Sequence, residues 1–206
     1  ELFYPEHLLS KRFTITYTGR LLSLALRDPS LLLAAIQRLD QAQAIQPDTF
    51  QVAWYTDDAS KALIEQEADR FGVSAYMDYR GYIPASEIPR VLNQSCVLLL
   101  LTNKAEKEKL QGIMTTKFFE SLAVEKPILC VRSDEACLAE TIQRTHSGLA
   151  ATQVEEVCQF LLRYYNEWKT KGYTTSAVDR SQLRQFSRQE QANQFIKLIN
   201  HCMYYG

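Results

Sequence analysis

The chain has 206 residues, of which 46% are hydrophobic and 23% are charged. This length and balance are typical of one globular domain with a sizeable core, and they exclude a low-complexity or disordered chain. The formal net charge of −1 excludes the overall basic field that attracts nucleic acid, so we expect no nucleic-acid partner.

Cysteine and histidine usage bounds the compartment and the metal chemistry. Five cysteines are scattered without a Cys-x-x-Cys pair, and three histidines lie far apart. An odd, scattered set of cysteines is typical of a reducing compartment. No metal-ligand spacing is present, and the longest apolar run, Val97–Leu101, is too short to span a bilayer. We therefore expect no metal and a cytoplasmic location, either free or at the inner face of the membrane.

Residues 1–12 differ in character from the rest of the chain. The sequence starts at Glu1 rather than Met, and Pro5 and mixed polar residues precede the first predicted strand. We expect this stretch to be a linker from a missing N-terminal domain, so that the sequence is a piece of a longer protein. Residues 13–206 are then a single domain.

Strands and helices alternate along that domain. Alternating or continuous apolar and β-branched residues predict strands at 13–18, 50–55, 75–79, 97–101, 127–131 and 148–150. Helical spacing with capping residues predicts helices at 28–39, 58–71, 86–92, 115–124, 134–144, 154–168 and from 187 onward. Residues 171–181 are polar and lack periodicity, which indicates a loop.

This alternation predicts an α/β fold with a doubly wound, Rossmann-like parallel sheet between two helical layers. Ligands of such folds bind beyond the carboxyl ends of the strands, where the strand order reverses. The loops that we expect to carry function are therefore residues 18–28, 55–60, 79–86, 102–116 and 132–134.

Two of these loops carry residues suited to a nucleotide. Gly19 lets a ligand approach the backbone at a strand end, and Arg20 offers a fork of donors that matches phosphate. Tyr82 could stack on a flat base, beside the exposed backbone of Ile83. The plainer alternatives are a tight turn with a surface Arg in the first loop and a simple strand-to-helix turn in the second.

The third loop leads into the helix predicted at 115–124, whose first N–H groups form an anion site. Lys117 in the first turn opposes the helix dipole unless an anion neutralises it. Glu120, one turn later among apolar residues, could accept two hydrogen bonds from a diol such as ribose. The plainer alternative is an ordinary glutamate on the solvent face of a helix.

The stretch Thr116-Lys-Phe-Phe-Glu120-Ser-Leu-Ala-Val-Glu-Lys-Pro127-Ile-Leu resembles the donor-site signature of retaining family 4 glycosyltransferases, which have the GT-B fold. Weaker segments follow in the family's order at 17–20, 81–84, 95–100, 138–142 and 147–148. The resemblance covers about residues 13–168. It implies that the chain is the C-terminal, donor-binding half of such an enzyme.

The resemblance also implies a function and a set of site residues. The function is to bind a nucleoside-diphosphate sugar, such as a UDP-sugar, for retaining transfer to a glycan or lipid-linked acceptor in polysaccharide or glycolipid synthesis. The implied roles are ribose binding by Glu120, diphosphate binding by Gly19 and Arg20, phosphate and sugar binding by Ile113, Met114, Thr115 and Thr116, and base contact by Tyr82 and Ile83. Arg20 and Lys117 would stabilise the charge on the leaving diphosphate and are the candidate catalytic residues.

The chain departs from the family pattern at two places. Gly112 stands where the family has the first glutamate of its motif, and the lysine that usually follows the Gly-Arg loop is missing. Arg27 or Lys117 could replace that lysine. No Asp-x-Asp is present, so we expect no metal on the diphosphate.

Two other functions remain open. One is a non-catalytic nucleotide-sugar-binding module, which Gly112 favours. The other is a flavodoxin-like regulatory or interaction domain, for which Asp57-Asp58 is the sole acidic pair; we interpret that pair as a helix cap. If the chain is a donor domain, its acceptor binds through the missing domain, and the chain alone is expected to be inactive.

Overall fold

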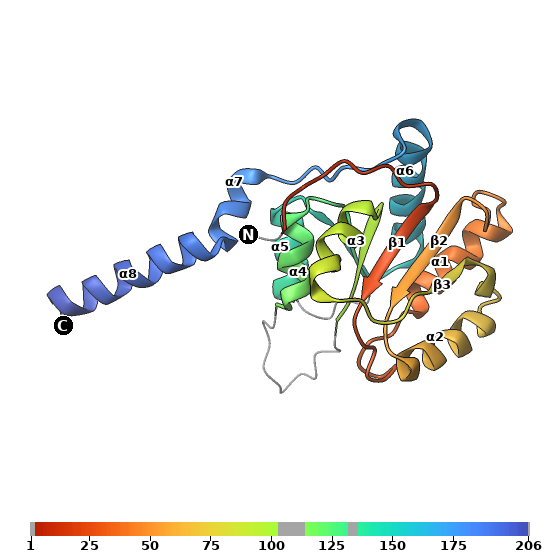
Figure 1. Ribbon diagram of the computed structural model, residues 1–206, viewed down its shortest axis with the longest axis horizontal. Coiled ribbons are helices and arrows are strands. Elements are labelled where there is room, and N and C mark those ends of the chain that lie inside the picture. Colours follow the sequence, from red (N-terminus) through yellow and green to blue (C-terminus); the bar gives the residue numbers. More distant parts are fainter. Residues whose placement is uncertain (1–2, 103–113, 132–135, 206) are drawn as a thin grey trace.

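The computed structural model of the protein describes residues 3–102, 114–131 and 136–205 (Figure 1). Its strands are β1 (Phe13–Thr18), β2 (Phe50–Tyr55), β3 (Met77–Tyr79), β4 (Val97–Leu101), β5 (Ile128–Val131) and β6 (Gly148–Ala151). Its α-helices are α1 (Ser30–Gln41), α2 (Asp58–Arg70), α3 (Ile88–Gln94), α4 (Thr116–Ala123), α5 (Ala136–Arg144), α6 (Val154–Lys171), α7 (Arg180–Leu183) and α8 (Arg188–Tyr205).

All six strands form one parallel sheet in the order β3-β2-β1-β4-β5-β6. The predicted doubly wound, Rossmann-like α/β fold is therefore confirmed. The chain builds outward from β1 in one direction and then, after β3, in the other. The strand order therefore reverses between β1 and β4, which is the point where folds of this kind form a ligand-binding crevice beyond the carboxyl ends of the strands.

Helices cover both faces of the sheet. Phe13, Ile15 and Tyr17 of β1 point to one face, where they share a core cluster with residues of α1, α2 and α6. On the other face, α4 and α5 pack on β4 and β5, and Leu92 of α3 packs on Leu98. Strand β4 is buried on both faces, as its continuous apolar sequence predicts.

Several boundaries differ from the prediction. Strand β3 starts at Met77 because a 3-10 turn occupies residues 74–76, and a second 3-10 turn at 85–87 precedes α3. Helix α6 continues to Lys171 and ends at Gly172, whose positive φ closes the helix in the left-handed conformation. Asp134, the predicted cap of α5, lies outside the described residues. Element ends are set by such local hydrogen bonds, which periodicity does not reveal.

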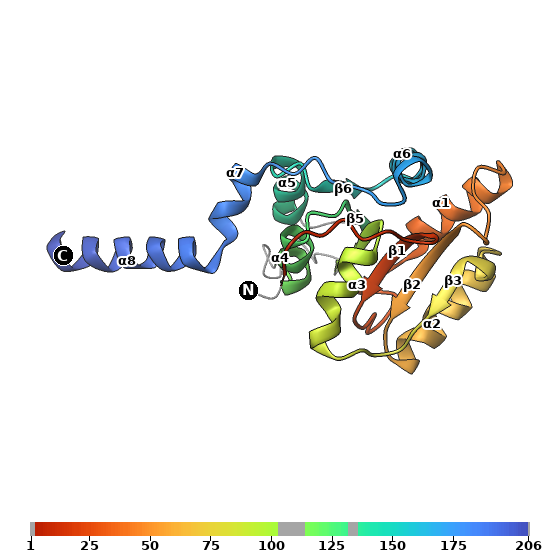
Figure 2. The same cartoon turned by 45° about the horizontal axis from the view of Figure 1, so that its top comes forward.

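The N-terminal segment lies against the segment that follows α6. The backbone N–H of Ser10 donates to the carbonyl of Gly172 over 2.9 Å, and the rings of His7 and Tyr173 lie 4.9 Å apart. Residues 3–12 thus pack along the segment after α6 (Figure 1). Helix α8 points away from the sheet in both views (Figures 1 and 2), with Phe195 and Ile199 exposed.

Candidate functional site

Gly19 ends β1 in a conformation that favours glycine. Its φ is +124°, and its N–H donates to the carbonyl of Tyr55 over 2.8 Å. A Cβ at this position would collide with Nζ of Lys117. The backbone angle favours glycine here, and any other residue would also displace the flexible end of the Lys117 side chain. The predicted first and third loops meet at this point.

Lys117 is a half-buried cation at that meeting point. Its Nζ lies 5.0 Å from the centroid of the Tyr17 ring, which offers a weak cation–π contact. Burial and, to a lesser degree, the nearby charge of Arg27 lower the pKa of Lys117 to about 8, while Glu120 opposes the shift. Holding a charged lysine here is costly, and an anion in the crevice would offset that cost.

Helix α4 begins close to the end of β1, because Lys117 in its first turn approaches Gly19. Thr115 occupies the N-cap position in an extended conformation, but its side chain does not cap the helix. The first turn holds Lys117 and no acidic residue. A helix start with a cation and no side-chain cap attracts anions, because its first N–H groups and its dipole both present positive charge.

Glu120 lies one turn further along α4 and is half-buried. Burial raises its pKa, and Lys117 opposes this shift. The residue lines a cavity of about 530 Å³ between α4, the start of α8 and the N-terminal segment, together with Phe3, Thr116, Phe119, Ala123, Phe186, Arg188 and Gln191. The structure therefore does not place Glu120 on a fully exposed helix face. None of Gly19, Arg20, Tyr82 and Lys117 lines this cavity.

Arg20 and Tyr82 meet, although they are 62 positions apart in the sequence. The Arg20 Nε donates to the Tyr82 hydroxyl over 2.9 Å and lies 3.2 Å from Oδ2 of Asp57. Tyr82 is 59% exposed, so its ring is accessible to a ligand. Gly81 has a φ of +66°, which turns the chain before Tyr82, and Ile83 after it is half-buried. This contact joins the loops after β1, β2 and β3.

The backbone carbonyl of Arg20 connects the Arg20–Asp57–Tyr82 contacts with the residues around Lys117. The Tyr17 hydroxyl donates to the Arg20 carbonyl over 2.9 Å, and the Arg27 guanidinium donates to the same carbonyl. Arg27 also influences the pKa of Lys117. We define the strand-end cluster as Tyr17, Gly19, Arg20, Arg27, Asp57, Tyr82, Thr115, Thr116, Lys117 and Glu120.

Some predicted site residues contribute differently or are not described. Met114 is half-buried and packs against the apolar cluster around Leu100 and Phe118, so its side chain supports the start of α4. Ile113 and Gly112 lie outside the described residues.

Asp57 and Tyr17 were missed as site residues. Asp57 does cap α2, as interpreted from the sequence, but it also pairs with Arg20. Its position in a strand-end loop was a usable signal. Tyr17 carried no such signal, because as the last apolar residue of an alternating strand it resembles ordinary core.

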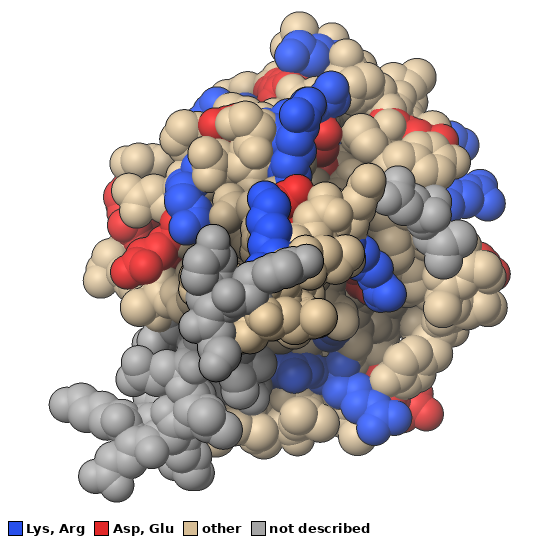
Figure 3. Space-filling view, turned by 90° about the vertical axis from the view of Figure 1, so that its left-hand side faces the viewer, with Lys and Arg blue, Asp and Glu red and all other residues tan. Residues whose placement is uncertain are grey.

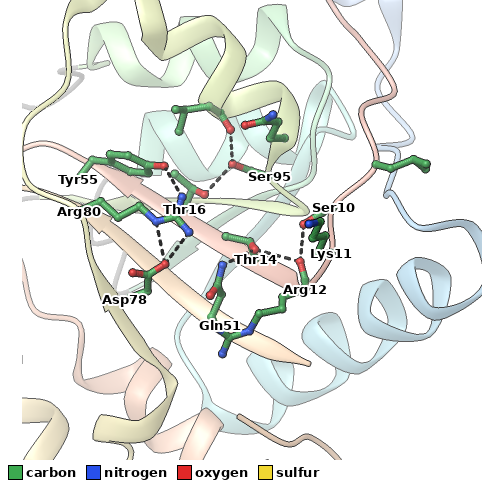
Figure 4. Close-up of a pocket in the computed structure, with 13 residues that line it drawn as sticks. Ser10, Lys11, Arg12, Thr14, Thr16, Gln51, Tyr55, Asp78, Arg80 and Ser95 are labelled. Atoms are coloured by element: carbon green, nitrogen blue, oxygen red, sulfur yellow. Dashed lines mark hydrogen bonds and ion pairs between the residues drawn. The ribbon is translucent and has the colours of Figure 1, made fainter. Parts of the chain in front are cut away.

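A separate polar groove lies on the sheet face away from α1. Figure 4 shows its lining from β1, β2 and β3, beside the start of β4, around a cavity of about 540 Å³. The polar groups pair with one another: Gln51 with Thr14 over 3.0 Å, Ser95 with Thr16 over 2.6 Å, and Arg80 with Asp78 over 2.8 Å and with Tyr55 over 3.2 Å. None of the predicted site residues lines this groove. Because its polar side chains hydrogen-bond to one another, few of them remain available to bind a ligand.

The described residues include no cluster of three or more His, Cys, Asp or Glu side chains that could hold a metal ion. Among the same residues, no helix has the length and apolar character needed to cross a membrane. On the face seen in Figure 3, Lys and Arg side chains are interspersed with Asp and Glu, which differs from the continuous basic surface of many nucleic-acid-binding proteins.

The chain is similar to known proteins in structure rather than in sequence. No protein-family model and no curated protein sequence matches the chain. Solved structures do match it. One is the C-terminal domain of a glycosyl transferase group 1 family protein, LpcC, from Francisella tularensis, with a TM-score of 0.55 and 15% identity over 84% of this chain and 96% of that one.

Two longer proteins match as well. Sucrose-phosphate synthase from Thermosynechococcus elongatus has a TM-score of 0.66 and 15% identity, over 100% of this chain and 51% of that one. HepE from Anabaena, solved with UDP-glucose, has a TM-score of 0.64 and 13% identity, over 92% of this chain and 49% of that one. The chain thus spans about half the length of these two glycosyltransferase-like neighbours, and it has the fold of such domains.

Proposed function

We propose that the domain binds the nucleoside-diphosphate part of a nucleotide sugar in the crevice above β1 and β4, as the donor-binding half of a glycosyltransferase. The observation that carries this proposal is the half-buried Lys117, held against Gly19 at the uncapped start of α4. A lysine in that place is favourable once a phosphate group lies between it and the helix N–H groups.

The remaining residues suit the rest of such a ligand. Arg20 carries a guanidinium at the rim of the crevice, where it suits the diphosphate. Glu120 offers two acceptor oxygens for ribose hydroxyls, and the exposed Tyr82 ring and the Ile83 backbone suit the base. The loops after three strands and the start of one helix thus offer a side chain suited to each part of the ligand: the base, the ribose and the diphosphate.

The chemistry in this proposal depends on charge stabilisation. Breaking the bond between sugar and phosphate leaves negative charge on the diphosphate, and Lys117, Arg20 and the amides at Thr115 and Thr116 would stabilise it. These groups would supply the charge without a metal. By analogy with the family that the sequence resembles, we propose transfer with retention, from a UDP-type donor.

The acceptor would bind to a second domain. Neighbours with about twice the matched length support this view, because this chain aligns with only about half of each. We propose an acceptor glycan or lipid-linked sugar, as in cytoplasmic polysaccharide or glycolipid synthesis at the membrane. The domain alone would then bind a nucleoside diphosphate weakly and transfer no sugar, because half a crevice leaves water at the diphosphate.

Calorimetric titration with UDP, GDP and ADP tests the binding step. We expect one of them to bind in the crevice bounded by Gly19, Tyr82 and Thr115, which a soaked crystal would locate. No binding by any of them, or density only in the polar groove of Figure 4, would overturn the proposal. Sugar transfer by the full-length protein would separate an enzyme from a non-catalytic binding module.

A further inference from the structure

Asp57 connects the start of α2 to the Arg20 loop through both of its carboxylate oxygens. Oδ1 accepts from the backbone N–H of Ser60 over 2.9 Å and caps the helix, while Oδ2 lies 3.2 Å from Nε of Arg20. Because each oxygen has its own partner, the cap and the ion pair are held at the same time.

Ser60 adds a second connection between the same two segments. Its hydroxyl is buried and accepts from the backbone N–H of Leu21 over 2.9 Å. The start of α2 therefore holds the loop after β1 at the Arg20 side chain and at the next backbone amide. A long arginine side chain at the surface would otherwise sample many rotamers.

The side chain of Arg20 is held mainly at one nitrogen. Nε donates to the Tyr82 hydroxyl and lies 3.2 Å from Oδ2 of Asp57, and the guanidinium carbon lies 5.9 Å from the centroid of the Tyr82 ring. Within the described part of the chain, the two terminal amino groups of the guanidinium make no hydrogen bond. A guanidinium held at Nε keeps its terminal N–H donors available in a set direction, which suits a bidentate acceptor such as phosphate.

We propose that Asp57 is a positioning residue of the nucleotide site, which fixes Arg20 so that its terminal amino groups face the diphosphate. The inference rests on the proposed function and adds a residue to it. Asp57 does not itself contact the ligand. It acts by ordering Arg20 before binding, so that less side-chain freedom is lost when the diphosphate arrives.

The substitution D57N separates the two connections that Asp57 makes. The amide oxygen of asparagine can still cap α2, whereas the charge that pairs with Arg20 is gone. Asp58, the next residue, is exposed and carries the same charge in the first turn of α2. D58N is therefore a control for the loss of one negative charge at this helix start.

The measurement is a double-mutant cycle on the affinity for the nucleoside diphosphate that the wild-type protein binds. We expect D57N to weaken binding about three- to tenfold, which is the size expected of coupled neighbours. D58N should leave it within about twofold. In an R20A background, D57N should have no further effect, because the side chain that it positions is absent. Binding of the corresponding nucleoside, which lacks the diphosphate, should be the same in all variants.

Each other outcome is decisive. Wild-type affinity in D57N, or an equal loss in the presence and absence of Arg20, would overturn the positioning role. A melting temperature of D57N well below that of D58N, with additive effects, would show that Asp57 acts through the helix cap. If the wild-type protein binds no nucleoside diphosphate, the proposed function itself fails, which is a distinguishable result.

Discussion

Two lysines lie at opposite ends of the strands, Lys117 at the carboxyl edge of the sheet, where the strands end, and Lys126 at the amino edge, where they begin. Lys117 is half-buried and Lys126 is buried, and the comparison between them shows what burial alone can and cannot indicate. Lys117 lies at the carboxyl edge, at the start of α4. Lys126 follows α4 and precedes β5, at the amino edge, where it is 2% exposed. Burial is the largest influence on both and lowers the pKa of each. Burial therefore does not distinguish a functional lysine from a structural one.

Their surroundings do distinguish them. Lys126 lies near Glu167, whose negative charge favours the ammonium group, and it follows the carboxyl end of α4, where the helix dipole favours a cation, although its Nζ makes no hydrogen bond with the described residues. Lys117 lies near Arg27 and at the amino end of the same helix, which both disfavour a cation, and only Glu120 opposes them. A half-buried lysine in surroundings that oppose its charge is a candidate for binding an external anion.

The largest expected effect comes from removing each lysine in turn. Lys117→Met should weaken nucleoside-diphosphate binding by about 1.5–3 kcal/mol, the size of a charge-assisted hydrogen bond, because the phosphate loses its half-buried cation. Stability should hold or increase, since a costly half-buried charge is gone. Calorimetry and thermal unfolding measure the two effects.

Lys126→Met is the matched control for this substitution. It removes the same charge from the opposite edge and should leave affinity unchanged, whatever it does to stability. Equal losses of affinity in the two variants would show that Lys117 has no specific role in binding the nucleoside diphosphate.

Glu120→Ala should weaken the same binding by about 1–3 kcal/mol, because two hydrogen bonds from ribose to a carboxylate are lost. Its effect on stability should be much smaller, since the half-buried carboxylate has a raised pKa and gains little from its site. The exposed Glu140 on α5 offers a control in Glu140→Ala. Unfolding of the Glu120 variant with affinity intact would make Glu120 a structural residue.

Binding should also depend on pH through Lys117. With a pKa of about 8 in the ligand-free protein, Lys117 loses its proton as the pH rises through 8, and an anion binds the protonated form. Affinity should therefore fall about tenfold between pH 7 and pH 9, as expected for one proton taken up on binding. The fall should be absent in Lys117→Met.

The same shift has the opposite consequence for folding. Because the folded-state pKa of Lys117 is lower than the 10.5 of the free side chain, the unfolded state binds more protons between these values. The contribution of Lys117 to stability therefore improves as the pH rises from about 8 to 10.5. Affinity and stability that changed in the same direction with pH would exclude Lys117 as the responsible group.

The smallest expected effect is that of a chelator. The proposed site neutralises the diphosphate with Lys117, Arg20 and helix N–H groups, so affinity measured with EDTA and with Mg²⁺ should agree within about twofold, or roughly 0.4 kcal/mol. A large loss on adding chelator would show that a metal ion also neutralises the diphosphate at the carboxyl edge.

Much of the fold was predictable because its signals are local. The strands at 13–18, 50–55 and 97–101 were predicted with their observed bounds, since their length and apolar pattern follow from burial on one face or both. The start of α4 was also predicted to within one residue. Short β3 was predicted too long, because a 3-10 turn competes for residues 74–76.

The sequence by itself therefore determined the alternation of strands and helices, the parallel sheet, and the loops in which a site had to lie. Only the tertiary structure decided which of those loops meet. The contact of Arg20 with Tyr82, the collision that any Cβ at Gly19 would have with Lys117, and the pairing of Asp57 with Arg20 join residues that lie far apart in the chain. The reason is physical: propensity and periodicity act over a few residues, whereas the burial and charge environment of a side chain depend on strand order and on what packs across the sheet.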